Sequence, residues 1–141
     1  AYEDLPKAFK LELYGKKAVH KYDTNRAVAR PKNLSGIEVS ETPDVIHPLV
    51  RTHDETGNQA VYYNSNRTDS VIGMRPDESD ALLDSLGEHI TRDKYRYDHD
   101  WQVGDVLFWD NRCLIHSVNV DYPVGQDRRH QRILLKGSRP T

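Results

Sequence analysis

One histidine and two arginines near the end of the chain have the residue types to hold a metal ion and small carboxylates. They are His116, Arg128 and Arg132. Because successive side chains of a strand alternate between its two faces, Arg128 and Arg132 would share one face, roughly 13 Å apart. If the face that carries His116 is interior, both guanidinium groups need anionic partners, since an unpaired buried charge is very costly. The spacing therefore predicts an interior site for a metal ion and two separate anions.

The stretch that carries these side chains, residues 101–137, predicts strands joined by turns. A β-prone run at residues 106–109 reaches the sequence Asp-Asn-Arg, and a second run follows at residues 113–118. Asp and Asn favour a turn because their short side chains bond their own backbone. A second turn signal, Tyr-Pro-Val-Gly, precedes a third run at residues 128–135. The three runs are expected to form strands of one site.

Other residues of the same stretch are interpreted as scaffold. The aromatic side chains of Trp101 and Trp109 are expected in the core, and residues 110–112 are expected to support the turn. Cys113 is expected to be a small strand residue beside the site, because reactivity of a thiol requires a lowered pKa that a sequence does not show.

The order of these motifs resembles the TauD/TfdA family of Fe(II)- and 2-oxoglutarate-dependent dioxygenases. The pattern W-x-x-G-D-V-x-x-W-D-N-R begins at Trp101 and is followed by His116, a turn, and R-x-x-x-R ending in a glycine. The segment HPLVRTHDETG at residues 47–57 and the helical stretch near residues 78–86 are also similar to the family. The resemblance covers nearly the whole chain but only the C-terminal half of a family member. It implies part of a double-stranded β-helix, a jelly-roll barrel.

The resemblance also implies roles for the three side chains. His116 matches the second histidine of a facial triad of two histidines and one carboxylate, which holds Fe(II) and leaves positions for 2-oxoglutarate and O2. Arg128 matches the arginine that grips the distal carboxylate of 2-oxoglutarate in a fork-to-fork pairing. Arg132 matches the arginine that holds a sulfonate, sulfate or carboxylate group of the substrate. The alternatives are a core histidine satisfied by a neighbour and a surface ladder of charges.

One departure from the family pattern concerns the rest of the iron site. The family takes its other histidine and its aspartate from a His-x-Asp motif in the N-terminal half, and no histidine in this sequence has an aspartate two residues later. The nearest imitations, at His53 and at His99-Asp100, are interpreted as decoys. His99 and Asp100 would point to opposite faces of a strand, and His53, in a His-x-Glu, sits at a hairpin turn where acidic residues ordinarily face solvent. We therefore expect residues 1–141 to form a single domain that corresponds to the C-terminal part of such an enzyme.

The expected reaction hydroxylates a small anionic substrate and releases succinate and CO2 from 2-oxoglutarate. Two alternatives stay open. The chain could be a catalytically incomplete fragment that binds small anions or a metal without activity. A weaker alternative is a cupin-like metal protein that uses His53, His99 and His116.

Composition excludes several classes of partner. The 141 residues are 36% hydrophobic and 30% charged, with a formal net charge of −2, so neither nucleic acid nor a membrane is expected to bind. A single cysteine excludes an intrachain disulfide framework and fits a reducing cytoplasm, and no signal-peptide pattern opens the sequence. Sheet edges left open by missing strands could be covered by self-association into a homo-oligomer.

The remaining elements predict a mainly β fold with appended helices. A helix is expected from Asp4, as its cap, to Gly15, and a second at residues 76–90. A hairpin is expected to join residues 45–52 to residues 59–64, with glycine at the tight position of its turn. The irregular segment at residues 21–44 is interpreted as a substrate loop or a connector.

Overall fold

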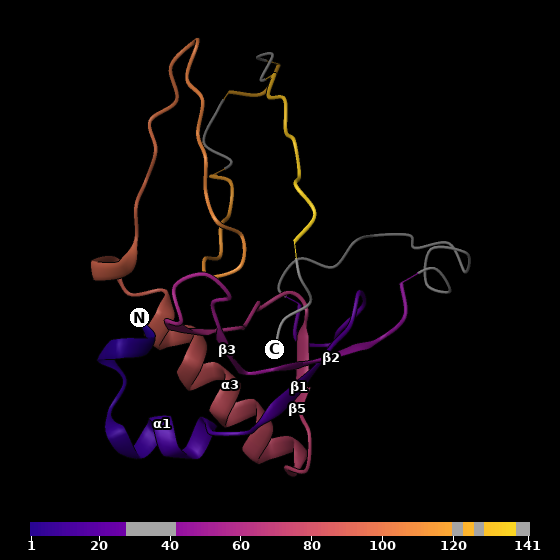
Figure 1. The fold of residues 1–141 in the computed structure, drawn as a ribbon. Helices are drawn as coiled ribbons and strands as arrows, with labels where there is room; N and C mark the ends of the chain where they lie inside the picture. Colours follow the sequence, from indigo (N-terminus) through magenta and orange to yellow (C-terminus); the bar gives the residue numbers. More distant parts are fainter. Residues whose placement is uncertain (28–41, 120–122, 126–128, 138–141) are drawn as a thin grey trace.

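A computed structural model of the protein describes residues 1–27, 42–119, 123–125 and 129–137. Within these ranges the chain forms two antiparallel β-sheets with two appended α-helices and two short 3-10 helices, as Figure 1 shows. In chain order the elements are η1 (Tyr2–Asp4), α1 (Lys7–Leu13), β1 (Lys17–His20), β2 (Val45–Pro48), β3 (Val50–Thr52), β4 (Gln59–Val61), β5 (Thr68–Val71), α3 (Pro76–Ile90) and η2 (Asp93–Tyr95). None of the described helices is long and apolar enough to cross a membrane.

The first helix starts later than the sequence predicts. Its cap is Pro6, and Asp4 belongs to the preceding 3-10 turn. The Asp4 carboxylate instead accepts hydrogen bonds from Lys94 Nζ at 2.7 Å and from Tyr95 Oη at 2.9 Å. After the helix, Gly15 has a φ of +69°, a conformation that glycine adopts without steric cost.

The larger sheet has the strand order β2-β1-β5, and two of its strands were not expected from the sequence. In the antiparallel register Ala18 of β1 lies opposite His47 of β2 and Val71 of β5. Helix α3 packs against β5. The buried core is formed by side chains from α1, the sheets and α3: Leu5, Leu13, Ala18, Leu49, Tyr63, Val71, Leu82, Leu83 and Leu86.

The predicted hairpin forms, but only with its inner half. Strands β3 and β4 pair with Val50 opposite Val61. The connecting turn is closed by the backbone of His53, which donates to Asn58 O at 2.8 Å and accepts from Gly57 N at 2.9 Å. The outer half of the expected first strand, β2, pairs with β1 instead. The chain changes sheets at Leu49, whose N–H donates to Lys16 O and whose carbonyl oxygen accepts from Tyr62 N.

Helix α3 confirms the prediction for residues 76–90, with Pro76 as its first residue. The periodic leucines Leu82, Leu83 and Leu86 are buried beneath it. The Ser79 hydroxyl accepts a hydrogen bond of 2.8 Å from the backbone N–H of Val71, which fixes the helix to the end of β5.

The predicted strands of residues 101–137 are not formed within the described part of this stretch. Residues 101–119 and 129–137 run as extended segments away from the sheets in Figure 1, and none of them is paired in a ladder. A β-prone run becomes a strand only where a neighbouring strand takes up its N–H and C=O groups, and no described segment does so here. The sequence pattern shows that these residues favour a strand, but in the described part of the stretch they are not paired with one.

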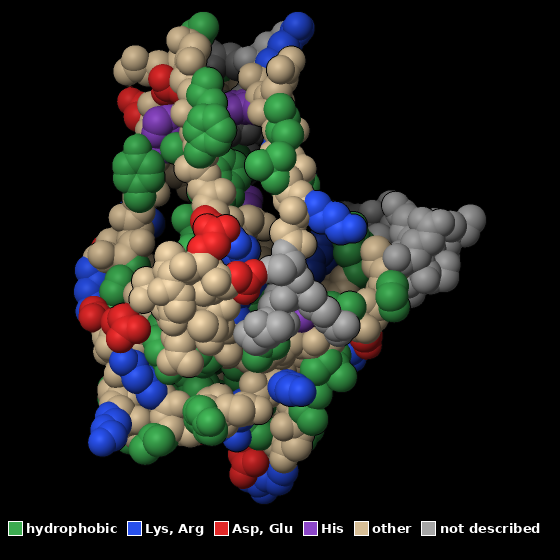
Figure 2. Space-filling model, in the orientation of Figure 1, with side chains coloured by type: hydrophobic (Ala, Val, Ile, Leu, Met, Phe, Trp, Pro, Cys, Tyr) green, Lys and Arg blue, Asp and Glu red, His purple; other side chains and the backbone are tan. Residues whose placement is uncertain are grey.

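The same absence of neighbours makes the expected core positions of this stretch wrong. Trp101 and Trp109 are 41% and 38% exposed, and Phe108 is 88% exposed. Figure 2 shows apolar side chains on the surface of this extended part. An apolar side chain is buried only when a second layer of structure lies over it. The apolar residue pattern of this stretch therefore does not by itself predict which side chains are buried.

The expected loop of residues 21–44 lies for the most part outside the described residues. Its first residues are fixed to the structured part of the chain. The Thr24 hydroxyl donates to Asp69 Oδ1 at 2.8 Å, and the Arg26 guanidinium binds Asp80 and Asp84 on α3. These ion pairs tie the end of the described segment to the exposed side of that helix.

Candidate functional site

The structure places His116 on an extended segment, with its side chain exposed. Its ring lies against the indole of Trp109, with 5.1 Å between the ring centroids and 59° between the planes. Arg132 is also exposed, and Arg128 lies outside the described residues. The condition under which the sequence predicts an interior site, that the face of His116 is interior, is not met in the described part of the chain, where no second layer covers His116 or Trp109.

His99 is held by residues close to it in sequence. Its Nδ1 lies 2.9 Å from Tyr97 Oη, and its Nε2 lies 3.1 Å from Asp105 Oδ2. Its ring contacts Trp101 edge-on, and Trp101 in turn contacts His130 with 4.9 Å between centroids. Among the described residues of these extended segments, side-chain contacts and not backbone ladders thus join them.

His53 joins two turns that are distant in sequence. The sequence places it at a hairpin turn as a decoy for the iron-binding motif, and in the structure its side chain is only 8% exposed. The backbone N–H groups of Glu55 and Thr56 point at Nδ1, at 3.2 and 3.3 Å. Nδ1 therefore accepts, and Nε2 carries the proton of the neutral ring. That N–H donates to Asp110 Oδ2 at 2.8 Å.

Asp110 is the centre of the second turn. Its Oδ1 accepts from the backbone N–H of Arg112 at 2.9 Å, and the guanidinium of Arg112 binds both carboxylate oxygens, with Nη2 only 2.6 Å from Oδ2. The hydrogen bonds from Arg112, and then that from His53, hold the pKa of Asp110 well below its usual range. The same pairing with Asp110 raises the pKa of Arg112. The expected turn scaffold at residues 110–112 is thus confirmed, and an ion pair between Asp110 and Arg112 lies within it.

Three side chains at this point have the types and separation of metal ligands. Ligand atoms of His53, Asp110 and Cys113 all lie within 4.8 Å of one another. The hydrogen bonds argue for a scaffold instead. Nδ1 of His53 already accepts two N–H groups, Nε2 carries a proton, and a guanidinium cation shares the carboxylate, so no imidazole lone pair faces an ion.

The described residues do not form a complete iron site around His116. Within the described ranges, the only group of three or more potential ligands is the one at His53, and it does not include His116. A facial triad needs two imidazoles and a carboxylate on one ion. In the described part of the chain, no such set of ligand atoms includes His116. His53 and His99 are each held elsewhere by other partners, so the cupin-like combination of the three histidines is not assembled.

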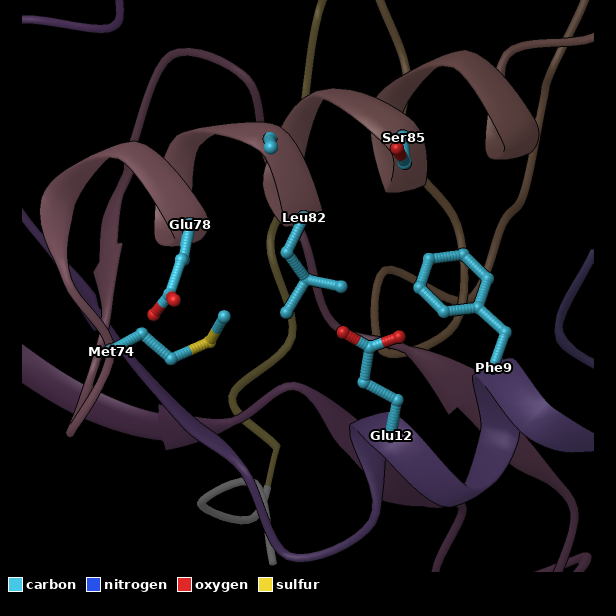
Figure 3. A pocket seen from close by; sticks show the side chains of 7 residues that line it. Phe9, Glu12, Met74, Glu78, Leu82 and Ser85 are labelled. Atoms are coloured by element: carbon cyan, nitrogen blue, oxygen red, sulfur yellow. The ribbon is translucent and has the colours of Figure 1, made fainter.

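An open groove lies between α1 and α3 (Figure 3). Its volume is about 530 Å³. Phe9 and Glu12 extend into it from α1, and Glu78 and Leu82 from α3. Its only charged lining groups are carboxylates, so it does not suit an organic acid. Of the predicted site residues that the structure describes, neither His116 nor Arg132 lines it.

A compact group of rings includes side chains from strands β1 and β2 of the larger sheet. His20, His47 and Tyr62 lie with their centroids 5.3 to 5.5 Å apart. Burial, with a smaller contribution from His47, lowers the pKa of His20 to about 4. The guanidinium of Arg51, which is only 2% exposed, lies 5.9 Å from the Tyr62 ring and 3.6 Å from Asp54. No local sequence pattern indicates this group, because its members come from three separate strands or strand ends.

Known proteins resemble the chain over nearly all of its length. The model of the "Taurine catabolism dioxygenase TauD, TfdA family" matches residues 1–134. The alpha-ketoglutarate-dependent 2,4-dichlorophenoxyacetate dioxygenase of Burkholderia sp. (strain RASC) is 37% identical over 139 residues, which is 99% of this chain and 46% of that protein. The alkylsulfatase of Acinetobacter baylyi is 33% identical over 144 residues, which is 97% of this chain and 45% of that protein.

Solved structures give the same result for the fold. A taurine dioxygenase from Burkholderia xenovorans superposes with a TM-score of 0.59 at 30% identity, covering 73% of this chain and 31% of that one. The structure of AAD-2 in complex with Mn(II) and N-oxalylglycine superposes with a TM-score of 0.63 at 26% identity, covering 72% and 40%. The chain spans less than half the length of each of these proteins.

Proposed function

The chain belongs to the TauD/TfdA family of dioxygenases, and we propose that it forms the C-terminal part of an Fe(II)- and 2-oxoglutarate-dependent enzyme. The proposed reaction hydroxylates a small anionic substrate while 2-oxoglutarate is converted to succinate and CO2. One observation carries the proposal: the family model matches residues 1–134 without leaving out the motif of residues 101–132. The two antiparallel sheets agree with part of a jelly-roll barrel, in which the extended segments would become paired strands.

Three side chains have proposed roles at that site. His116 would be one ligand of the iron, Arg128 would bind the distal carboxylate of 2-oxoglutarate, and Arg132 would bind the anionic group of the substrate. The proposed role of Arg132 is supported by its exposure and by the lack of a described carboxylate partner. Its guanidinium is therefore available for a bidentate anion. The described Trp109 ring supports the imidazole of His116 from one side.

The iron, when bound, supplies the oxidising chemistry, and the protein orients the organic acids beside it. The chain offers one imidazole toward it, so we infer that a histidine and a carboxylate from another polypeptide segment complete the triad. The proposed substrate class rests on the match of Arg132 to the family's arginine for the substrate anion, which favours a sulfonate, sulfate or carboxylate. The relatives named for 2,4-dichlorophenoxyacetate and for taurine are named for substrates of this kind.

An anaerobic titration with Fe(II) and 2-oxoglutarate tests the proposal through the visible charge-transfer band of the chelate. We expect His116→Ala and Arg128→Gln to abolish the band, and Arg129→Gln, which neutralises the arginine next to Arg128, to retain it. The titration is run on the chain alone and on the chain mixed with the N-terminal part of the 2,4-dichlorophenoxyacetate relative. A band that is unchanged in His116→Ala would contradict the assignment of the ligand.

A second candidate is a small-anion-binding module without activity. The incomplete triad favours it, because a single imidazole holds iron weakly. Calorimetric titration with 2-oxoglutarate in the absence of metal separates the two. Binding that is lost in Arg128→Gln, with no chelate band under any condition, would support the module over the enzyme.

A further inference from the structure

We propose that His53 is a positioning residue for His116: it fixes the turn at residues 110–112, and that turn sets where the Trp109–His116 pair lies. The inference rests on the proposed role of His116 as an iron ligand. It concerns a histidine that lies 57 residues from the turn it contacts.

The first step is the fixed orientation of the His53 ring. The ring is almost fully buried, and two backbone N–H groups of its own turn converge on Nδ1. They select the tautomer with the proton on Nε2 and aim that proton outward from the β3–β4 turn. The donor is therefore set in place before any partner arrives.

The second step is the rigidity of the turn that receives this donor. One oxygen of Asp110 accepts from the backbone N–H of Arg112, and the other accepts from His53. The Arg112 guanidinium binds both oxygens, and the backbone N–H of Cys113 points at Asp110 O at 3.4 Å. Fixing the carboxylate of Asp110 thus fixes the backbone on both sides of the turn.

The third step connects the turn to His116. The residue that enters the turn is Trp109, and its indole is the ring that contacts the His116 imidazole. His116 follows the turn by only a few residues. Trp109 and His116 therefore flank the fixed turn, one on its N-terminal side and one on its C-terminal side. Because these extended segments have no described ladder to hold them, the anchored turn is what keeps the two rings in contact with each other.

A second contact between the same two turns is much weaker. Arg112 Nη1 lies 3.5 Å from Glu55 Oε1, and the Glu55 side chain is 74% exposed. Exposed ion pairs of this kind contribute little, because water screens the charges and two long side chains lose freedom. The contact from His53 to Asp110 is short and partly buried, so it is the principal anchor.

The test is an NMR measurement on the full chain without iron or 2-oxoglutarate. In the unmodified chain we expect nuclear Overhauser cross-peaks between the Trp109 indole and the His116 imidazole, and a ring-current shift of the imidazole protons. His53→Phe and Asp110→Asn should each lose the cross-peaks and return the imidazole shift to that of an exposed histidine. His53→Gln, which keeps an N–H donor toward Asp110, should restore most of both signals. All spectra are recorded at one pH above the range in which imidazoles titrate.

Two control variants separate positioning from general destabilisation. His89→Phe makes the same change at another buried histidine, whose Nε2 lies 2.9 Å from Ala1 O, and Glu55→Gln removes only the weak contact. Both should keep the cross-peaks. If His53→Phe does not fold, Asp110→Asn decides the question, because it alters one partly exposed side chain without changing its size.

The proposal is overturned if the cross-peaks survive in both His53→Phe and Asp110→Asn, or if His89→Phe removes them to the same extent. Neither readout depends on a metal. A failed iron titration would therefore count against the proposed function but not against the positioning role of His53. Survival of the cross-peaks in the variants would count against the positioning role but not against the proposed function.

Discussion

His53 Nε2 and Asp110 Oδ2 lie 2.8 Å apart and join the turn of the β3–β4 hairpin to the turn at residues 110–112. In this contact the buried imidazole of His53 donates to the carboxylate of Asp110, which also binds the guanidinium of Arg112. It connects the well-packed part of the chain to the segment that carries His116. The structure of the candidate site therefore depends on a relationship between two turns, and several consequences can be measured.

The joined turns should resist mild acid. Contacts from Arg112 and His53 lower the pKa of Asp110 beneath its ordinary 3.8. A carboxylate with a lowered folded pKa contributes stability that is fully present above its unfolded pKa and is lost as pH falls through the folded pKa. We therefore expect the Arg112 side-chain N–H resonance to stay unchanged as pH falls from 7 to about 4 and to move only below that. A midpoint above pH 4 would contradict this, and Asp110→Asn should show no such transition.

His20 should give the fold a different dependence on pH. Burial, and to a smaller extent His47, lowers its pKa from 6.5 to about 4. Between these values the unfolded chain binds a proton that the folded chain does not, so the free energy of unfolding should rise as pH increases from about 4 to 6.5. The gain has an upper limit of roughly 3 kcal/mol. Urea unfolding at several pH values measures it.

The matched variants for this measurement are His20→Phe and His130→Phe. The first keeps a ring against Tyr62 and His47 but removes the proton site, so the rise between about pH 4 and 6.5 should flatten. The second changes an exposed histidine and should leave the rise in place. A flattened curve in His130→Phe alone would exclude His20 as the source.

The sequence predicts the parts of this fold that are encoded locally. The leucine spacing of residues 76–90 indicates a helix because one face of a helix repeats about every 3.6 residues, and α3 has those bounds. The turn with Gly57 indicates a hairpin, and Gly57 has a φ of +71°. In both cases the signal and the structure lie within about fifteen residues.

Elements that depend on distant partners were predicted poorly. Strands β1 and β5 are short and partly polar, and they exist because Ala18 lies between His47 and Val71. The run at residues 113–118 has a strong strand pattern but no described partner, so it does not pair. The contact of His53 with Asp110 leaves no local pattern at all.

The core beneath α3 should carry much of the stability. Leu83 is fully buried, whereas Leu11 on α1 is 67% exposed. We expect Leu83→Ala to lower the free energy of unfolding by roughly 2–5 kcal/mol, because it removes buried methyl groups and leaves a cavity. Leu11→Ala deletes the same atoms from the surface and should cost less than about 0.5 kcal/mol. Denaturant unfolding of both variants decides the point, and equal losses would contradict the assigned core.

Self-association should involve the extended segments. Phe108 and Val106 are largely exposed there, and apolar surfaces of this kind favour contact with another surface. Phe108→Asp should weaken any association seen by sedimentation velocity by roughly tenfold or more, given about 1.5–3 kcal/mol for a buried phenylalanine. Tyr14→Asp changes an equally exposed aromatic residue after α1 and should have little effect. An association that Tyr14→Asp weakens more strongly would place the contact elsewhere.

Arg132 should discriminate between anions by geometry as well as by charge. A guanidinium presents two parallel N–H groups to a carboxylate or sulfonate, whereas a lysine ammonium acts as a point charge. Arg132→Lys should therefore weaken binding of a small carboxylate or sulfonate even though the positive charge is kept. A lost charge-assisted hydrogen bond of about 1.5–3 kcal/mol corresponds to a loss of roughly ten- to a hundredfold. Lys136→Arg makes the reverse exchange at another exposed cation of the same segment and should leave binding unchanged. Chemical-shift titration of the two variants with the same anion measures both effects, and equal affinities for Arg132→Lys and the unmodified chain would remove Arg132 from the proposed anion site.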